Sequence, residues 1–258
     1  MAQTLTEWLN GEVKQLQKMP VSELSNTFFF RDPIRPHYID YEHFYSPADG
    51  TILYQKFIKD PKEPIVEIKG MNYTLQDVVG DEDYNKPSLV IGIFMSFYDV
   101  HINRIPYGGV LTYKPLDAIQ STNKPMLAVE KDILNKVINP NNMDYLKYNE
   151  RMWNKIYSLS LDYTYYLIQI ADEDVNVIAP FTNSQYDIFA QNERFSLIRW
   201  GSQVDLVLPL DERFDFDLVL DDHMHVNAGL DKLVKINFKN NESTKSPRRW
   251  YLQRKKKT

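Results

Sequence analysis

The sequence predicts an α+β fold, with a mainly antiparallel β core, an N-terminal helix and a few short helices. Tyr and Phe, which favour strands, number 17 and 13 among 258 residues, whereas glycines number only nine. Short apolar segments bounded by turn residues recur along the chain, and helical segments interrupt them too rarely for a regular alternation of strand and helix. Hydrophobic residues (43%) and charged residues (25%) occur at frequencies usual for globular proteins, so we expect one domain over residues 1–258.

Residues 5–18 have the clearest helical pattern. Thr4 and Glu7 have the spacing of a capping box at the start, and Pro20 lies beyond the end. The apolar positions fall on one face: Leu5, Trp8, Leu9, Val13 and Leu16. This face could dock on the core or lie in a membrane surface, and acidic residues on the polar side favour docking.

Most of the remaining chain is predicted to form strands. The expected strands are Ile52–Phe57, Ile65–Ile68, Leu89–Met95, Val110–Tyr113, Tyr163–Ile170, Val175–Ile178, Val204–Leu208 and Leu233–Phe238. Helical segments are expected at Leu75–Val79 and Leu127–Ile138. The triplet Asn149-Glu150-Arg151 is interpreted as a surface ion pair or the start of a helix.

Charge is distributed unevenly along the chain. Residues 245–258 hold seven basic residues and no acidic one, so residues 1–244 carry −12 although the whole chain carries −5. An acidic body of this kind argues against nucleic acid as a partner, because duplex binding depends on neutralising phosphates. No apolar run approaches the roughly 18 residues that cross a bilayer. The N-terminus also lacks the basic and apolar regions of a secretory signal, so we expect a cytoplasmic protein.

Several common site chemistries are missing from the sequence. There are no cysteines, which excludes disulfides, thiolate metal sites and a cysteine nucleophile. The scattered glycines form neither a Walker loop nor a G-x-G-x-x-G turn, and the Gly201-Ser202 pair is not part of a G-x-S-x-G elbow. His223 and His225 would share a face on a strand, but no third ligand is identifiable, so no metal site is predicted.

Three segments carry the functional signal when they are taken together. They are Ser46-Pro47-Ala48-Asp49-Gly50, the stretch SFYDVHINR at residues 96–104, and the stretch RFSLIRWGSQVDLVLP at residues 194–209. In order and spacing they closely resemble the phosphatidylserine decarboxylase family, in its short bacterial or archaeal branch. Weaker matches occur at residues 68–70, 149–151 and 228–229, and the resemblance runs from about Phe28 to about Ile236.

The resemblance implies an enzyme that makes a pyruvoyl cofactor by cutting its own chain. Ser202 Oγ would attack the carbonyl of Gly201 to give an ester, and elimination and hydrolysis would leave a pyruvoyl group derived from Ser202. Residues 1–201 would become a β chain and residues 202–258 an α chain. The pyruvoyl ketone would then bind the substrate amine and withdraw the electrons released with carbon dioxide, without a metal.

Four residues of this chain match the site residues of the family. Ser202 and Gly201 match the cleavage point, Asp49 matches the acid that helps to activate the serine, and His101 matches the histidine linked to decarboxylation. Gly201 suits the cleavage point because it leaves its carbonyl open to attack and tolerates unusual dihedral angles. Trp200 and the strand that begins at Val204 would fix the two sides of the cut.

Two departures from the family pattern leave the base for self-cleavage open. Arg104 stands where the longer bacterial enzymes have a second histidine, and it cannot act as a base at neutral pH. Either His101 serves both steps, or Asp49 acts directly or through water. Arg104 would instead pair with Asp49 or with a substrate phosphate. The second departure is Gln203, where many relatives have threonine or arginine, and its effect cannot be assigned from the sequence.

The resemblance defines the reaction better than the substrate, so three hypotheses remain. The first is decarboxylation of phosphatidylserine to phosphatidylethanolamine by a protein peripherally associated with a membrane surface. In that case the basic tail at residues 245–258 would meet anionic lipid, although it could equally be a solvated end. The second is decarboxylation of a soluble amino acid, and the third is a scaffold protein that no longer cleaves. The resemblance also implies a homodimer.

Overall fold

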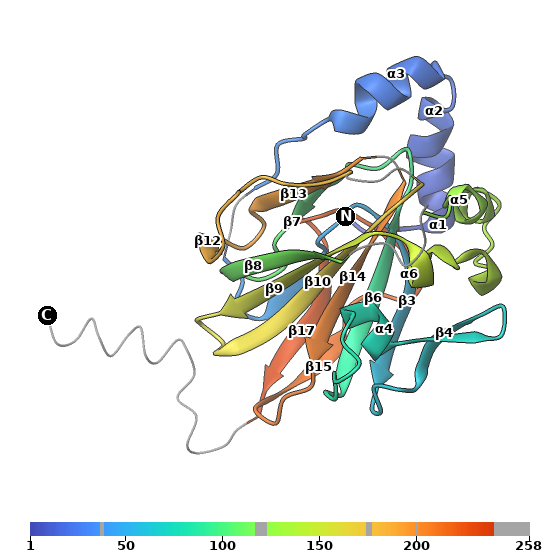
Figure 1. Ribbon diagram of the computed structural model, residues 1–258. Helices are drawn as coiled ribbons and strands as arrows, with labels where there is room; N and C mark the ends of the chain where they lie inside the picture. Colours follow the sequence, from blue (N-terminus) through green and yellow to red (C-terminus); the bar gives the residue numbers. More distant parts are fainter. Residues whose placement is uncertain (37–38, 117–122, 174–176, 200, 240–258) are drawn as a thin grey trace, which may run out of the picture.

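A nine-stranded antiparallel sheet forms the centre of the molecule (Figure 1). The computed structural model of the chain describes residues 1–36, 39–116, 123–173, 177–199 and 201–239. In spatial order the strands are β1 (Gln3–Thr4), β16 (Met224–Val226), β3 (Gly50–Ile58), β6 (Ser88–Met95), β14 (Ser202–Pro209), β10 (Tyr163–Ala171), β9 (Arg151–Ser158), β8 (Gly109–Leu116) and β12 (Asp187–Phe189). All residues of β6 and β14 are buried, because the sheet is covered on both faces.

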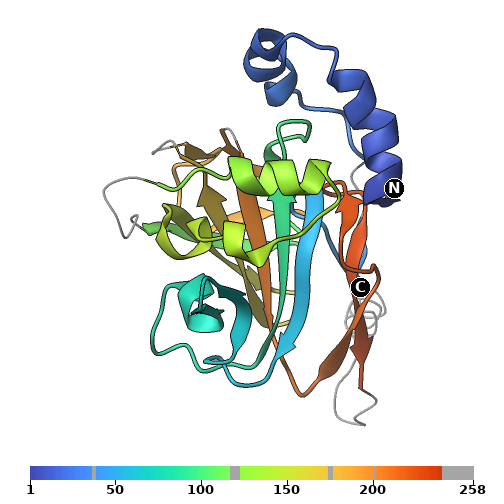
Figure 2. The ribbon, with the colours of Figure 1, turned by 90° about the vertical axis from the view of Figure 1, so that its right-hand side faces the viewer.

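Helices and a hairpin cover one face of the sheet, as the view in Figure 2 shows. They are the N-terminal helix described below, α4 (Leu75–Val79), α5 (Leu127–Leu134), the 3-10 turn η3 (Pro140–Asn142), α6 (Tyr145–Tyr148) and the hairpin of β4 (Pro64–Ile68) with β5 (Met71–Thr74). Their apolar side chains pack against Val90 and Phe94 of β6 and Val207 of β14. We call this side the Gln203 face, because successive strand residues point to opposite sides and Gln203 lies with Val207.

Two three-stranded sheets contribute to the core on the opposite side, which we call the Ser202 face. One sheet has the order β11 (Ile178–Pro180), β13 (Arg194–Ile198), β7 (Ile102–Arg104), and the other has the order β15 (Phe214–Leu218), β17 (Lys232–Phe238), β2 (His43–Tyr45). They pack with Ile91, Ile93 and Met95 of β6. All strand pairs are antiparallel, so the predicted α+β class with an antiparallel core is confirmed.

The N-terminal helix docks on the core, as the sequence analysis favoured. It runs without a break through α1 (Leu5–Trp8), the π-helical turn η1 (Leu9–Val13) and α2 (Lys14–Leu16), and it begins with the predicted Thr4–Glu7 capping box. Trp8 is fully buried and stacks on His225 with ring centroids 4.3 Å apart. α3 (Val21–Asn26) and the 3-10 turn η2 (Phe28–Phe30) follow at the same end of the sheet (Figure 1). In the described ranges, no helix has the length and hydropathy needed to cross a membrane.

Some element predictions were wrong, for local reasons. The helix expected to reach Ile138 ends at Leu134, and Lys136 adopts a left-handed backbone with φ 60°. Asn149 and Arg151 are buried and belong to neither a surface ion pair nor a helix start: Asn149 caps the end of α6, and Arg151 begins β9. Of the strand expected at Val175–Ile178, residues 175 and 176 lie outside the described residues, and Ile178 begins β11.

Candidate active site

Ser202 begins the central strand β14 and is fully buried. Its backbone lies between β6 and β10, opposite Met95 and Ala171. Its hydroxyl lies 3.3 Å from Met95 Sδ and 3.2 Å from His101 Nδ1. The structure therefore brings together the serine and the histidine that the sequence analysis singled out 101 positions apart.

The hydrogen bonds of His101 define its tautomer. Its Nε2 lies 2.9 Å from the carbonyl oxygen of Ser96, which can only accept, so Nε2 carries the hydrogen in the neutral ring. Nδ1 then presents a lone pair to the Ser202 hydroxyl. Burial lowers the pKa of His101 to about 4, so the imidazole is neutral near pH 7 and able to accept a proton from Ser202.

A segment after α3 covers His101. Phe29, itself 2% exposed, stacks on the imidazole with ring centroids 3.9 Å apart. Arg31 fastens this cover, because its guanidinium donates to the carbonyl oxygens of Asp99 (3.1 Å) and Tyr98 (2.7 Å). The aromatic cover keeps water from the ring, which is the physical cause of the depressed pKa of His101.

Asp99 stabilises the turn that carries His101. Its Oδ2 accepts from the amide and the hydroxyl of Ser96, both at 2.7 Å, and its Oδ1 lies 2.7 Å from His225 Nε2. Burial would raise the pKa of Asp99, but His225 and Ser96 outweigh burial and hold it below its ordinary value. The Ser96 carbonyl that orients His101 is therefore fixed by an ionised carboxylate.

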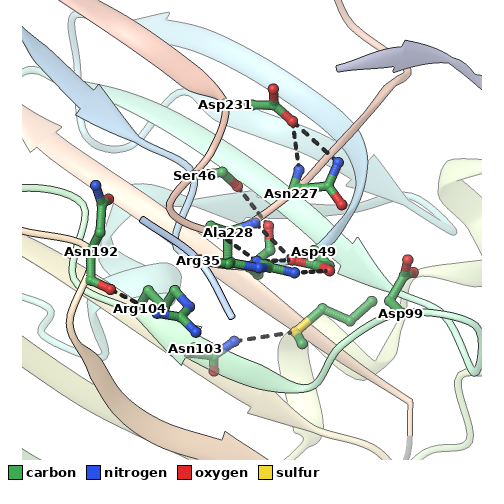
Figure 3. Close-up of polar contacts among 12 residues, drawn as sticks. Arg35, Ser46, Asp49, Asp99, Asn103, Arg104, Asn192, Asn227, Ala228 and Asp231 are labelled. Carbon is green, nitrogen blue, oxygen red and sulfur yellow. Dashed lines mark hydrogen bonds and ion pairs between the residues drawn. The ribbon is translucent and has the colours of Figure 1, made fainter. Parts of the chain in front are cut away.

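Asp49 lies in a separate polar cluster (Figure 3). Arg35 forms two bonds to its carboxylate, at 2.6 and 2.7 Å, and the amide of Ala228 donates to Oδ1 at 2.7 Å. All of these groups are buried. The bonds of Asp49 thus go to Arg35 and Ala228, and those of Ser202 go to His101 and Met95.

The backbone around Asp49 joins three of the matched segments. The amide of Arg104 donates to the carbonyl of Pro47, and the amide of Gly229 donates to that of Ser46. Gly50 must be glycine, because its φ is 154° and a Cβ would lie 2.1 Å from the carbonyl oxygen of Phe94. The Ser46–Gly50 loop is therefore packed between the segment after His101 and the loop at residues 227–231.

Arg104 does not pair with Asp49, the partner within the chain that the sequence analysis considered for it. Its guanidinium donates to the carbonyl of Asn192 at 3.0 Å and to Asp32 Oδ1 at 3.3 Å, while Asp49 pairs with Arg35 (Figure 3). Asp32 also forms an ion pair with Arg194 of β13. Arg104 thus links β7 to the chain that follows η2.

Gly201 lies against a carboxylate that the sequence analysis did not single out. A Cβ at Gly201 would lie 2.5 Å from Oδ2 of Asp172, a distance that real Cβ atoms do not show. Asp172 follows Ala171, which is opposite Ser202 in the sheet. A side chain at position 201 would therefore have to displace the Asp172 carboxylate. Trp200, expected to hold the other side of the cut, lies outside the described residues.

Gln203 belongs to a buried network on the other side of the strand. Tyr145 donates to Gln203 Oε1 at 2.6 Å, and Gln203 Nε2 donates to Tyr54 at 2.9 Å and to Asp205 at 2.6 Å. The hydroxyls of Tyr54 and Tyr73 donate to Asp205 as well. Burial raises the pKa of Asp205 to about 6 despite these bonds. The role of Gln203 in this structure is to fill and satisfy this network.

In the part of the chain that the structure describes, no three His, Asp or Glu side chains are grouped so that they could hold a metal ion. The two histidines of the 222–225 segment do not share a site: His223 is exposed at a left-handed position (φ 67°), and His225 is buried against Asp99.

Four residues at the site were missed in the sequence analysis: Phe29, Arg35, Asp99 and Asp172. The Ser96-x-x-Asp99 spacing is typical of a turn closed by a side chain, and it could have identified Asp99. The contacts of the others depend on chain segments far apart in the sequence, for which no local signal exists.

The chain is similar to known proteins of one family. The family model described as phosphatidylserine decarboxylase matches residues 25–231. The chain is 33% identical over 186 residues to a phosphatidylserine decarboxylase proenzyme of Erythrobacter litoralis, and 30% identical over 188 residues to one of Novosphingobium aromaticivorans. Each match covers 70% of this chain and 62% of the relative, so the chain spans less than two thirds of the length of these relatives. A similar proenzyme of Pelagibacter ubique is 28% identical over 182 residues, or 69% of this chain and 67% of the relative.

Proposed function

Because the chain belongs to the phosphatidylserine decarboxylase family, we propose that it is the precursor of a pyruvoyl-dependent decarboxylase that cuts itself between Gly201 and Ser202. The proposed reaction converts phosphatidylserine to phosphatidylethanolamine and carbon dioxide. One observation carries the proposal: a neutral imidazole nitrogen lies 3.2 Å from the hydroxyl of a serine that follows a closely packed glycine.

In self-cleavage, His101 is the base. Nδ1 of His101 takes the proton of Ser202 Oγ as the oxygen attacks the Gly201 carbonyl carbon, and the hydrogen bond from Nε2 to Ser96 keeps the ring in place. Of the bases that the sequence analysis left open, we take His101, because its Nδ1 lies 3.2 Å from the Ser202 hydroxyl whereas the Asp49 carboxylate is bound to Arg35 and Ala228.

Asp49 acts indirectly in this scheme. Its ion pair with Arg35 and its bond to the Ala228 amide join the Ser46–Gly50 loop to the loop at residues 227–231. We assign it the role of a positioning residue that keeps these loops packed around the segment carrying His101.

The residues at the cleavage point fit a pyruvoyl group. Residue 202 is buried at the start of a central strand, beside a neutral histidine. The group supplies a ketone that binds the substrate amine and accepts the electrons of the breaking bond to carbon dioxide. Among the described side chains, His101 lies within reach of residue 202 and can return a proton to the product.

Cleavage leaves one fold made of two chains. Residues 1–201 form the β chain, residues 202–258 form the α chain, and β14 of the α chain stays paired between β6 and β10 of the β chain. A single domain over residues 1–258 accommodates both. The basic tail at residues 245–258 lies outside the described residues, and its proposed contact with anionic lipid rests on its composition.

The substrate of the relatives, a phospholipid, requires a membrane or micelle surface, so we propose a protein peripherally associated with membranes that works as a homodimer. Vesicle binding before and after deletion of residues 245–258 tests the contribution of the tail. Unchanged binding would remove the tail as an anchor.

The intact mass of the purified protein under denaturing conditions tests the central step. The wild type should give two chains divided at Gly201-Ser202, with the smaller one headed by pyruvoyl, and Ser202→Ala should stay in one piece. A wild type that stays in one piece would support the scaffold hypothesis instead. A cleaved wild type that acts on free amino acids and not on phosphatidylserine would support the soluble substrate.

A further inference from the structure

Asp172 is held rigidly beside the proposed cleavage point. Its Oδ1 accepts hydrogen bonds from the amides of Met126 (2.7 Å) and Glu173 (2.8 Å), and the residue is 8% exposed. Amide donors of this kind stabilise the ionised form of a carboxylate. Asp172 therefore presents a fixed negative charge to Gly201.

The distance to the reacting group follows from covalent geometry. A Cβ on Gly201 would lie 2.5 Å from Asp172 Oδ2, and in any residue Cβ is about 2.5 Å from the carbonyl carbon. The carbonyl carbon of Gly201 is thus at most about 5 Å from Oδ2 of Asp172.

Self-cleavage changes the charge at this place. When the ester between Ser202 Oγ and the Gly201 carbonyl is formed, the peptide C–N bond breaks and the amine of residue 202 takes up a proton. Removal of the α-proton of residue 202 then breaks the Cβ–Oγ bond, and Gly201 departs as a carboxylate. Water and loss of ammonia convert residue 202 to the pyruvoyl group. A neutral carbonyl beside Asp172 is thereby replaced by an anion.

We propose that Asp172 expels the new C-terminus of the β chain and so uncovers residue 202 for the substrate. Two carboxylates at this separation repel strongly in a buried site, and only the cut end is free to swing away, because Asp172 is bound to two amides. Residue 202 is 0% exposed in the uncut chain, so a phospholipid headgroup cannot reach it. Moving the cut end away would give the substrate access to residue 202. Asp172 is in this sense a positioning residue. The inference rests on the proposed cleavage at Gly201-Ser202.

The test compares three cleaved proteins: the wild type, Asp172→Asn, and Glu67→Gln, a control that neutralises an exposed acid on β4. Intact mass first establishes that each is cut and carries pyruvoyl. Hydrogen–deuterium exchange is then measured for the peptide at residues 194–201, with uncut Ser202→Ala as the reference.

The wild type and Glu67→Gln should exchange in this peptide at least about tenfold faster than Ser202→Ala, whereas cleaved Asp172→Asn should stay close to the uncut reference. Decarboxylation of phosphatidylserine in mixed micelles should fall at least about tenfold in Asp172→Asn at equal pyruvoyl content.

Three results would overturn the inference. Cleaved Asp172→Asn could exchange as fast as the wild type, the cleaved wild type could exchange as slowly as Ser202→Ala, or Asp172→Asn could remain uncut, which would move Asp172 into the cleavage step. A wild type that is itself uncut would overturn the proposed function, and intact mass separates that failure from the other three.

Discussion

Ser202 and Gln203 are consecutive residues of β14 on opposite faces of one sheet, and they are held very differently. The Ser202 hydroxyl has one hydrogen and two neighbouring acceptors, His101 Nδ1 at 3.2 Å and Met95 Sδ at 3.3 Å. The Gln203 amide has bonds of 2.6, 2.9 and 2.6 Å to Tyr145, Tyr54 and Asp205.

Of these two consecutive residues, Ser202 is placed to react and Gln203 holds the strand in place. On the Gln203 face, short bonds among buried polar groups fix the strand and leave these groups no freedom to react. On the Ser202 face, the acceptor of the hydroxyl is a neutral imidazole nitrogen, which can take the proton as the oxygen attacks the neighbouring carbonyl in the proposed cleavage. Because both residues share one backbone, the rigidity of one face fixes the position of the nucleophile on the other.

The largest effect is expected from removing the base. His101→Ala should slow self-cleavage by about 10²–10⁴-fold, because general base catalysis contributes that much and no second base contacts Ser202 among the described side chains. Intact mass over time measures the rate. The control is His223→Asn, which changes an exposed histidine and suits its left-handed backbone. If His101→Ala were cleaved at a rate close to that of this control, His101 would not be the base that activates Ser202.

A smaller loss of rate is expected at the Asp49–Arg35 pair. Asp49→Asn and Arg35→Gln should each slow cleavage by about tenfold and lower stability by roughly 3 kcal/mol, because each leaves a buried group of the pair without its partner. The double variant should regain part of the stability. If Asp49→Asn blocked cleavage while Arg35→Gln did not, Asp49 would act on the reacting atoms, contrary to the positioning role.

On the Gln203 face the expected effect falls on stability alone. Tyr54→Phe removes the hydroxyl that joins Gln203 to Asp205 and should cost about 1–3 kcal/mol, which lowers Tm by roughly 3–10 °C. The cleavage rate should stay within about twofold of the wild type. Tyr157→Phe, which removes a hydroxyl on the exposed surface, is the matched control. If Tyr54→Phe kept its stability but slowed self-cleavage, the network on the Gln203 face would take part in the reaction of Ser202.

Glu130 of α5, on the Gln203 face, is expected to lower the stability of the protein. Its carboxyl group is buried, and burial raises its pKa to about 8 from an ordinary 4.5, although a hydrogen bond from the backbone of Phe97 acts in the opposite direction. The unfolded chain releases this proton at lower pH than the folded one, so the wild type loses stability as the pH rises from 4.5 to 8. Glu130→Gln should therefore be more stable by at least roughly 2–4 °C in Tm at pH 8 and no more stable below pH 4.5. Melting curves across this range would contradict the account if the difference did not grow with pH.

Features with a local pattern were predictable from the sequence. The strand β14 and the helix at Leu75–Val79 were found because their hydrophobic patterns follow the period of a strand or helix. The capping box at Thr4 was found from its spacing. Ser202 and His101 were found as matches to a family, and the structure brings them together.

Features that depend on the register of distant strands were not predictable. The approach of Asp172 to Gly201 follows from the pairing of Ala171 with Ser202 between β10 and β14. The stacking of Phe29 on His101 follows from how the chain returns over the sheet after α3. Asp49 was predicted to help to activate the serine, but its ion pair with Arg35 was not predicted, because no local sequence pattern indicates the position of Arg35.

The pH dependence of self-cleavage tests the central assignment most directly. The wild-type precursor is refolded or freshly synthesised at a series of pH values from 3.5 to 8, and the appearance of the two chains is followed by intact mass. Since burial lowers the pKa of His101 to about 4, the base is lost only as the pH falls through that value, and the rate should be flat from about pH 5 to 8 and fall steeply near pH 4. A decline that begins near pH 6.5, or a rate that His101→Ala shares across the whole range, would contradict His101 as the buried neutral base.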